Sequence, residues 1–502
     1  MESEYGILGQ GMSAKVGQVG NVRGAMFVGG SYSHRSTSVD AEKTLNKYPE
    51  YMESDGARVP SALIDTPGLH EVSAKTGLGG IRCAHTTASG RLFVVFESSV
   101  FEFAADFSRA FLFRLDSDGG RVTMVDNGEQ LFLADGWSSQ GWIYDLTANT
   151  AALITDINYP GGYFACFLDG YFLTEMPGSQ KFYWSQLNDG MVWPALNFAS
   201  AEGFPDAIVS MVCTNLEIWL LGSKSTEVWY HSTDPIYTFQ RFPSAVIPIG
   251  CAAPWSVAEI SGVIFWIGAA ANGYGSIWMS QGHGLPKRVS NYGTEYQISR
   301  DNLADAVAYC YAQEGHTFYV LSLPSANKTL CFDVTTGQWH DRGYMVPETG
   351  VVQRHLGHCL TFAFGKNIIG DFRNDALYWY DMDWYRDGAA DRIKRMRRFP
   401  TYHADRAIVS YWSLEIFQDT GNAPLVGDGS APQMMLRISN DGGRTWPGEL
   451  WRSMGKQGEY TKRVRWGSHL GQARERVFEV TSTEPIKQPW LGAYIEAEAV
   501  TP

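Results

Sequence analysis

The stretch LFVVFESSVFEF, Leu92–Phe103, holds two short apolar runs separated by the polar residues Glu97 to Ser99. Val and Phe favour the pleated surface of a strand, and a short polar break between two such runs predicts a tight hairpin. Similar pairs of runs return six more times along the chain, each ending in or beside an aromatic residue. The repeated hairpin, rather than any single run, therefore determines the fold class.

The seven hairpins are regularly spaced. Their ends fall 40 to 53 residues apart, at Phe103, Tyr144, Trp184, Tyr230, Met279, Phe332 and Tyr380. A repeat of about 40–50 residues with about four short strands has the size of a β-propeller blade. One four-stranded sheet cannot bury both faces alone, but a ring of sheets can. We predict an all-β chain with a six- or seven-bladed β-propeller over residues 60–385, and a stack of two sheets is the structural alternative.

The flanks of the repeat region differ from it. Residues 1–59 predict an extended N-terminal segment, and residues 386–400 predict a basic linker. Alternating apolar and polar residues then predict a C-terminal β-sandwich-like domain over residues 401–502. Helical patterning is weak, and only Ser38–Tyr48 and Arg386–Arg398 are compatible with short helices.

Composition narrows the function. The 502 residues carry a formal net charge of −13, which argues against a general phosphate-binding surface but suits a wall that DNA passes without adhering. Seven scattered cysteines predict buried, reduced thiols in a protein made in the cytosol. The start of the chain shows no secretion signal, and the most apolar window is broken by Glu259 and glycines, so we expect no membrane span.

A cluster of basic residues stands out in this acidic chain. It is a candidate strip for docking an acidic partner, with a solvated linker as the alternative and a nucleic-acid contact less favoured. Its members are Arg386, Arg392, Lys394, Arg395, Arg397 and Arg398.

Catalytic motifs are missing from the sequence. It has no H-E-x-x-H, G-x-S-x-G or Walker pattern, and the pair His355 and His358 lacks a third metal ligand. A glycosidase needs two carboxylates facing each other across a cleft. The carboxylates are scattered in turn-like segments: Glu314, Asp333, Asp341, Asp371, Asp375 and Asp381. We predict a protein that is not an enzyme and that uses no cofactor and no metal.

The stretch SNDGGRTW, Ser439–Trp446, fits the pattern S-x-D-x-G-x-T-W and resembles the Asp-box of sialidases and other β-propeller proteins. The Asp441 carboxylate can accept backbone N–H groups of its own loop, Gly443 can adopt positive φ, and Trp446 can cover the loop. One complete copy outside the repeats indicates a structural turn, formed by Ser439, Asp441, Gly443, Thr445 and Trp446. A propeller glycosidase or depolymerase, or a sugar-binding receptor-recognition protein, remains an alternative.

Ordered segments along most of the chain resemble one phage family, the tail hub or nozzle proteins of short-tailed bacteriophages, also called packaged-DNA stabilisation proteins. The segments include GGSYSHRSTSVDAEKTLNKYPE (Gly29–Glu50), LIDTPGLHEV (Leu63–Val72), the stretch Tyr183–Met211, GHGLPKRVSNYGTE (Gly282–Glu295) and the stretch Arg463–Glu496.

The resemblance implies a structural protein of the virion tail that is made in the host cytoplasm. Such proteins form rings, usually of six copies, below the portal and the tail adaptor. They extend the DNA channel, retain the packaged genome, and provide attachment for tail fibres, spikes or a needle. Genomic DNA would pass through the channel without sequence-specific binding.

Overall fold

The computed structural model describes residues 22–23, 27–37, 39–54, 56–73, 75–203, 205–232, 234, 237–269, 275–282, 284–299, 302–404, 407–467 and 469–500. The chain divides into two compact units. Thr66–Ile393 forms the propeller unit, and Met1–Asp65 joins Lys394–Pro502 in the sandwich unit. The units thus divide the chain at Asp65/Thr66 and at Ile393/Lys394, whereas the sequence predicted divisions after residues 59, 385 and 400.

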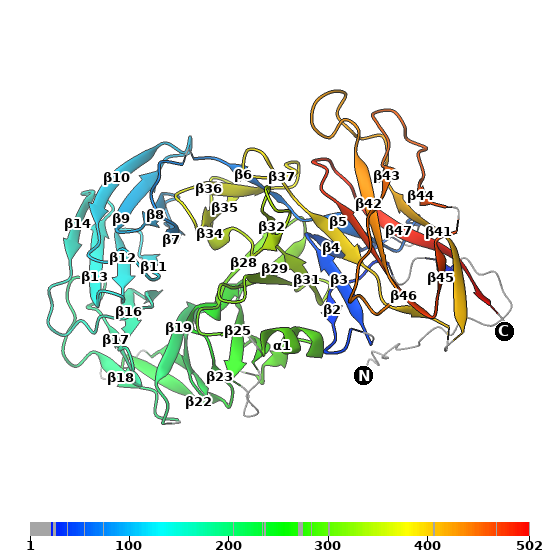
Figure 1. The fold of residues 1–502 in the computed structure, drawn as a ribbon. Helices are drawn as coiled ribbons and strands as arrows, with labels where there is room; N and C mark the ends of the chain where they lie inside the picture. The colour runs from blue at the N-terminus through cyan, green and yellow to red at the C-terminus, as the bar shows by residue number, and fades with distance from the viewer. Residues whose placement is uncertain are drawn as a thin grey trace. The chain divides into compact units, whose positions relative to one another are not determined.

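The propeller unit consists of consecutive antiparallel sheets arranged around a centre (Figure 1). The first sheet contains β7 (Ile81–Thr86), β8 (Leu92–Phe96), β9 (Ser99–Phe103) and β10 (Arg109–Arg114). The second sheet contains β11 (Thr123–Asp126), β12 (Gln130–Asp135), β13 (Gln140–Asp145) and β14 (Thr150–Leu153). The third contains β15 (Cys166–Leu168), β16 (Tyr171–Glu175), β17 (Lys181–Trp184) and β18 (Phe198–Ser200). The fourth contains β19 (Ile208–Thr214), β20 (Glu217–Gly222), β21 (Thr226–His231) and β22 (Phe239–Ile247).

The later sheets follow the same order. The fifth contains β23 (Gly250–Cys251), η1 (Pro254–Ser256) as an inserted turn, β24 (Ala258–Ile260), β25 (Val263–Ala269), β26 (Ser276–Gln281) and β27 (Lys287–Arg288), followed by α1 (Tyr292–Ile298). The sixth contains β28 (Val307–Gln313), β29 (His316–Leu323), β30 (Lys328–Asp333) and β31 (Gln338–Arg342), followed by the hairpin β32 (Tyr344–Met345) and β33 (Val352–Gln353). The last contains β34 (Gly357–Ala363), β35 (Lys366–Asp371), β36 (Leu377–Asp381) and β6 (Gly68–Glu71), with β37 (Arg386–Asp387) and β38 (Asp391–Arg392) beyond it.

Burial along β8 explains why the repeated runs are continuously apolar. All five of its residues are buried. Leu92 and Val94 pack in one cluster with Ile368 of the last sheet, whereas Phe93 packs in another with Leu131 of the second sheet. Alternate side chains of one strand therefore contact the two neighbouring sheets, and both faces of the strand must be apolar.

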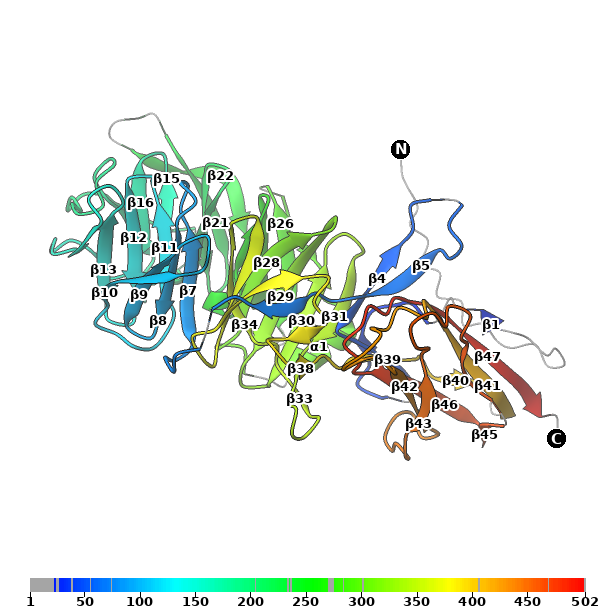
Figure 2. The same ribbon diagram turned by 90° about the horizontal axis from the view of Figure 1, so that it is seen from above.

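A strand from the beginning of the propeller unit completes its last sheet. Antiparallel pairing of β6 with β36 places Leu69 opposite Tyr380, and β37 pairs with the other edge of β6 in the parallel sense. A Cβ atom on Gly68 would lie 2.0 Å from the carbonyl oxygen of Trp384, so this approach requires glycine. Since β7 also contacts β34, the first and last sheets are neighbours and the ring is closed (Figures 1 and 2).

The sandwich unit has two sheets that draw strands from both ends of the chain. One contains β4 (Lys47–Tyr51), β5 (Ser61–Asp65), β47 (Trp490–Val500), β41 (Ile408–Gln418) and β44 (Val464–Trp466), with β1 (Val22–Arg23) and β45 (Gly471–Ala473) at its sides. The other contains β3 (Ala41–Leu45), β39 (Arg395–Arg398), β46 (Glu475–Ser482), β42 (Gln433–Ser439) and β43 (Leu450–Ser453), with β2 (Tyr32–Ser33) and β40 (Tyr402–His403).

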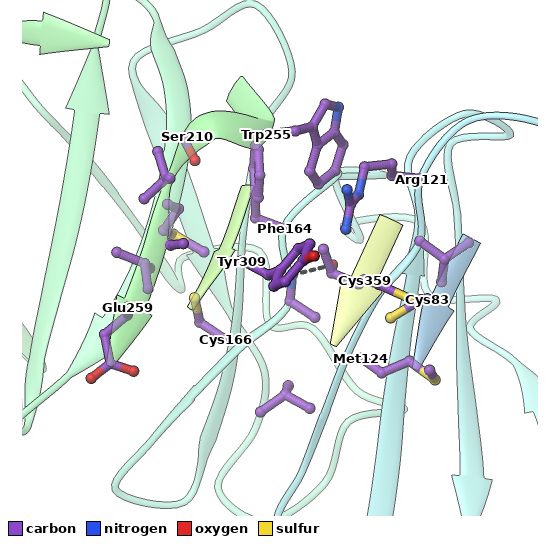
Figure 3. A pocket seen from close by; sticks show the side chains of 18 of the residues that line it. Cys83, Arg121, Met124, Phe164, Cys166, Ser210, Trp255, Glu259, Tyr309 and Cys359 are labelled. Carbon is purple, nitrogen blue, oxygen red and sulfur yellow. Dashed lines mark hydrogen bonds between the residues drawn. The ribbon is translucent and has the colours of Figure 1, made fainter. Parts of the chain in front are cut away.

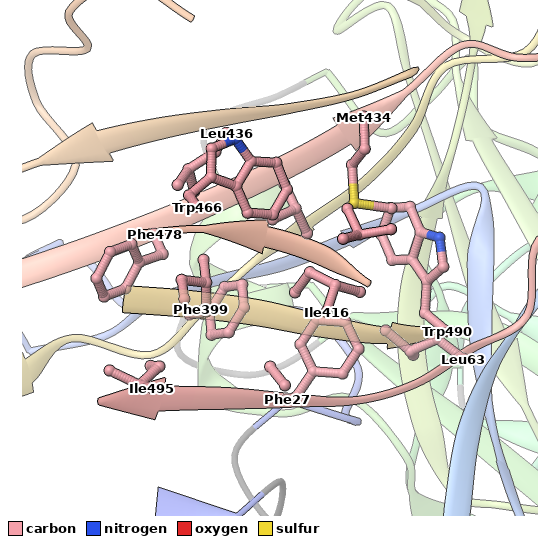
Figure 4. Packing of buried hydrophobic residues seen from close by; sticks show 14 of the residues in the cluster. Phe27, Leu63, Phe399, Ile416, Met434, Leu436, Trp466, Phe478, Trp490 and Ile495 are labelled. Carbon is pink, nitrogen blue, oxygen red and sulfur yellow. The ribbon is translucent and has the colours of Figure 1, made fainter. Parts of the chain in front are cut away.

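Residues from both ends of the sequence also fill the core of the sandwich unit. Phe27 and Leu63 from the N-terminal part lie in one buried cluster with Phe399, Trp466 and Trp490 from the C-terminal part (Figure 4). Phe27 lies with its ring centroid 5.2 Å from that of Phe399 and 6.3 Å from that of Trp490. Large aromatic side chains bury much apolar surface, so removal of the N-terminal strands would open this core.

Two expectations for the flanks need correction. Within Ser38–Tyr48, where a helix is compatible with the sequence, the described residues form β3 and the start of β4, and Ser38 lies outside the described residues. Within Arg386–Arg398 the chain forms β37, β38 and β39 instead of a helix or an irregular linker. The described part of the N-terminal segment, residues 1–59, contributes strands to both sheets of the sandwich unit. Pairing with distant strands determines these elements, and local patterning does not show it.

The described residues contain no helix that is long and apolar enough to cross a membrane.

The ring closure gives the first prediction. Leu69 is 0% exposed and lies at the closing strand, so Leu69→Ala should lower the free energy of unfolding of the propeller unit by about 2–5 kcal/mol. Urea unfolding followed by tryptophan fluorescence measures this change. Leu196→Ala is the matched control, because Leu196 is 86% exposed in the same unit. Equal effects of the two substitutions would contradict a closing role for Leu69.

Candidate functional sites

The Asp-box loop follows β42 and is held by hydrogen bonds to one side chain. The Asp441 Oδ1 accepts the Ser439 hydroxyl at 2.6 Å and the backbone N–H groups of Arg444 and Thr445 at 2.9 and 3.0 Å. Its Oδ2 accepts the Thr445 hydroxyl at 2.6 Å. These donors, the Ser439 hydroxyl first, hold the pKa of Asp441 well below its usual range. The carboxylate therefore serves as the acceptor of its own turn.

The rest of the motif closes the same loop. The N–H of Gly443, at φ +84°, donates to the Ser439 hydroxyl at 2.9 Å. The indole Nε1 of Trp446 donates to the carbonyl oxygen of Gly443 at 3.0 Å. Hydrogen bonds thus link all five residues of the motif to one another. We propose that the loop is a structural clamp of the sandwich unit.

The structure joins the Asp-box to the basic cluster, which the sequence did not suggest. The Trp446 ring lies 4.9 Å from the guanidinium carbon of Arg398 and 5.3 Å from that of Arg437. Both arginines also pair with Glu479, which is 1% exposed. Burial raises the pKa of Glu479, but Arg398 and Arg437 outweigh that effect and hold it below its ordinary value. The sequence does not indicate Glu479 as a partner of these arginines, because Arg398 and Arg437 lie far from it along the chain.

The basic cluster does not form one surface. Arg386 and Arg392 lie opposite each other on the paired strands β37 and β38 of the propeller unit. Lys394 to Arg398 belong to the sandwich unit. Arg395 and Arg397 are 0% exposed, so the expectation that they dock a partner is wrong. Lys394 is half-buried, and burial lowers its pKa. A docking role stays a proposal for Arg386, Arg392, Lys394 and Arg398.

Arg397 and Arg395 attach the N-terminal strands to the sandwich. Arg397 donates to the carbonyl oxygens of Phe27 and Gly30 at 2.6 and 2.8 Å. Arg395 Nε lies 2.9 Å from Asp65 Oδ1, and Lys47 Nζ lies 2.7 Å from the same oxygen. Burial lowers the pKa of Lys47 to about 8, although Asp65 opposes this shift. One buried carboxylate thus neutralises cations from both parts of the chain.

The remaining candidate residues have local roles. Asp333 accepts a hydrogen bond from the ring of His316, and Asp381 accepts one from the ring of His70. Asp375 accepts hydrogen bonds from the Thr76 hydroxyl and the Arg109 guanidinium. Asp371 pairs with Arg373, Asp341 is buried, and Glu314 lies in a turn at φ +49°. Burial lowers the pKa of His355 to about 3, and its Nδ1 accepts the N–H of Gly357. Among the described side chains, no group of three or more His, Cys, Asp or Glu could hold a metal ion.

The propeller unit contains a central cavity of about 360 Å³ (Figure 3). Residues of β7, β11, β15, β19, β24, β28 and β34 line it, so each sheet contributes an inner strand. Four of the seven cysteines are among the lining residues: Cys83, Cys166, Cys213 and Cys359. All seven cysteines of the chain are free thiols.

A closed ring of antiparallel sheets, together with a two-sheet unit stabilised by buried ion pairs, defines a β-propeller protein with a β-sandwich domain. A family model described as bacteriophage P22 Gp10, beta-propeller, matches residues 14–385, and one described as bacteriophage P22 Gp10, beta-sandwich, matches residues 394–498. The chain therefore belongs to the bacteriophage P22 Gp10 family, the phage DNA-stabilisation or tail nozzle proteins. It is a structural protein of the phage tail.

The chain is similar to several solved structures at low identity. Virginiamycin B lyase from Staphylococcus aureus is 9% identical, with 62% of this chain and 98% of that chain covered and a TM-score of 0.44. The extracellular domain of BT4673 from B. thetaiotaomicron is 10% identical, with 77% and 47% covered and a TM-score of 0.44. The Pan2 WD40 domain from Neurospora crassa is 9% identical, with 60% and 89% covered and a TM-score of 0.40. No curated protein matches the sequence.

The Asp-box geometry predicts that Asp441→Ala lowers the soluble yield, the apparent Tm or incorporation into tails, because four donors of the turn lose their acceptor. The depressed pKa of Asp441 implies that the contribution of its carboxylate is present above the ordinary Asp pKa and is lost as pH falls through the lower folded value. Thermal unfolding at several pH values measures this contribution of the Asp441 carboxylate to stability. Arg444→Ala is the control, since the Arg444 side chain is exposed. Normal assembly of Asp441→Ala with loss of a hydrolytic activity would refute the structural role.

The shared carboxylate gives a further prediction. Asp65→Asn keeps the size of the side chain but leaves the buried cations of Lys47 and Arg395 without their anion. The free energy of unfolding of the sandwich unit should fall by about 3–5 kcal/mol. Urea unfolding measures this loss, and Glu498→Gln, at an exposed position of the same unit, should be close to neutral. A neutral Asp65→Asn would show that this network does not hold the N-terminal strands.

Proposed function

We propose that this chain is a subunit of the hub or nozzle ring of a short phage tail. In this role it extends the DNA channel below the portal and the tail adaptor, and retains the packaged genome. The observation that carries the proposal is that both domain models of one family match in order over residues 14–385 and 394–498. A ring of identical subunits, six by the family resemblance, would enclose the channel.

The charge of the chain supports passage of DNA rather than capture. The formal net charge is −13, and a DNA-binding surface needs clustered, accessible cations. In the basic cluster, Arg395 and Arg397 are buried and Arg398 pairs with Glu479, so these three cations add little accessible positive charge. An acidic wall would repel phosphate and let the genome slide during ejection.

The proposed partners follow from the proposed position of this chain at the end of the tail. The chain would contact its own copies, the adaptor ring below the portal, and fibres, spikes or a needle. It would be made in the host cytoplasm and act in the virion without catalysing a reaction. The local hydrogen bonds of Asp333, Asp371, Asp375 and Asp381 favour this structural role over that of a glycosidase.

Particles assembled without this chain test the proposal. They should package DNA and then release it, so that the fraction of DNA-filled heads in micrographs falls, and tail fibres or spikes should be absent. Supplying the unchanged chain in trans should restore both. Filled, infectious particles without the chain would contradict the proposal. Release of sugar from host polysaccharide by the isolated chain would instead establish an enzyme.

A further inference from the structure

One cation of the central cavity is not neutralised by the protein. Arg121 precedes β11 and lines the cavity, where it lies beside Trp255 (Figure 3). Its guanidinium carbon is 5.4 Å from the centre of the Trp255 ring. Its one hydrogen bond to the described residues is a long one, 3.3 Å, from Nη1 to the carbonyl oxygen of His358. Its Nε is buried without a hydrogen-bond partner.

Two buried arginines of the propeller unit, Arg82 and Arg342, differ from the half-buried Arg121. Arg82 donates to the Ser117 and Gly119 carbonyl oxygens and pairs with Asp135 at 3.2 Å. Arg342 also has a buried Nη2 without a hydrogen-bond partner, but aromatic rings enclose its guanidinium, with centroids 5.0 to 5.7 Å from the guanidinium carbon, whereas Arg121 lines a cavity. Arg121 forms no ion pair with any residue that the structure describes, and buried charges in proteins are generally paired.

The groups nearest to Arg121 do not provide a negative charge. Burial lowers the pKa of Arg121, while Cys359 and Cys83 oppose the shift only if they are ionised. Burial raises the pKa of Cys83 to about 12 and that of Cys359 to about 11, so both thiols are neutral near pH 7. The Glu259 carboxylate, which also lines the cavity, accepts hydrogen bonds from the Thr214 hydroxyl and the backbone N–H of Gly262. Figure 3 shows it across the cavity from Arg121.

We propose that the central cavity of the propeller unit binds one small anion, a phosphate or a carboxylate, on Arg121. The guanidinium presents its two Nη groups in a fixed planar fork, which suits two parallel hydrogen bonds to such an anion, and the only described bond of these groups is the long one from Nη1. A cavity of about 360 Å³ lies at the small end of ligand pockets and accommodates a single small anion rather than a nucleic-acid strand. This site is independent of the proposed DNA channel.

Binding would stabilise the ring. The anion would be held by a residue before β11 whose guanidinium also bonds the backbone of β34, a strand of the last sheet. A ligand that binds only the folded state raises stability with its concentration. Inorganic phosphate should therefore raise the apparent Tm of the full chain at constant ionic strength.

Equilibrium dialysis of the full chain against radiolabelled inorganic phosphate tests the site directly. We expect saturable binding of about one phosphate per chain, weakened at least about tenfold in Arg121→Lys and abolished in Arg121→Met, because charge-assisted bonds to the fork are lost. Arg114→Met is the matched control, since Arg114 is exposed on β10, and it should bind as the unchanged chain does. Circular dichroism confirms that each variant is folded.

The outcomes separate clearly. Displacement of phosphate by acetate would assign the site to carboxylates as well as phosphate, and failure of acetate to compete would assign it to phosphate. Absence of saturable binding of either anion to the unchanged chain would overturn the proposal. Binding that is equally strong in the unchanged chain and the folded Arg121→Lys variant would also overturn it, even if Arg121→Met failed to fold.

Discussion

The pairing of β6 with β36 is the constraint on which the rest of the chain depends. A ring of sheets that bury their faces on one another leaves two uncovered faces unless the first and last sheets meet. Here the chain enters the propeller unit at Thr66 and forms β6 at once. It leaves through β37, which pairs with β6, and β38, which pairs with β37. The same sheet therefore holds both the beginning and the end of the ring.

This closure explains why the second unit needs both flanks of the sequence. The propeller unit is inserted between residues 65 and 394, so the residues before and after it leave from one sheet. Neither flank has a complete core of its own. The N-terminal flank supplies Phe27 and Leu63, and the C-terminal flank supplies Trp466 and Trp490. Buried arginines of β39 then fasten the two flanks by ion pairs and backbone hydrogen bonds.

Arginine has several structural roles in this acidic chain. Arg395 and Arg397 are internal ties, Arg398 shares Glu479 with Arg437 beneath the Asp-box tryptophan, and Arg342 is surrounded by aromatic rings. Burial of cations with their partners removes positive charge from the surface, which leaves fewer accessible cations to contact phosphate groups. Arg121 departs from this arrangement, since the protein supplies no anion for it among the described residues.

The sequence by itself determined the local features. Runs such as Leu92–Phe96 predict buried strands because both faces of each sheet are covered, and the Asp-box residues predict their turn because Asp441 bonds only to its immediate neighbours. Tertiary structure decided the rest. Nothing near Leu69 indicates a partner at Tyr380, and nothing near Arg395 or Arg397 indicates that these cations are buried against Asp65 and the N-terminal backbone. Strand pairing and ion pairing between distant residues depend on which surfaces the folded chain brings together, and local patterning does not record this.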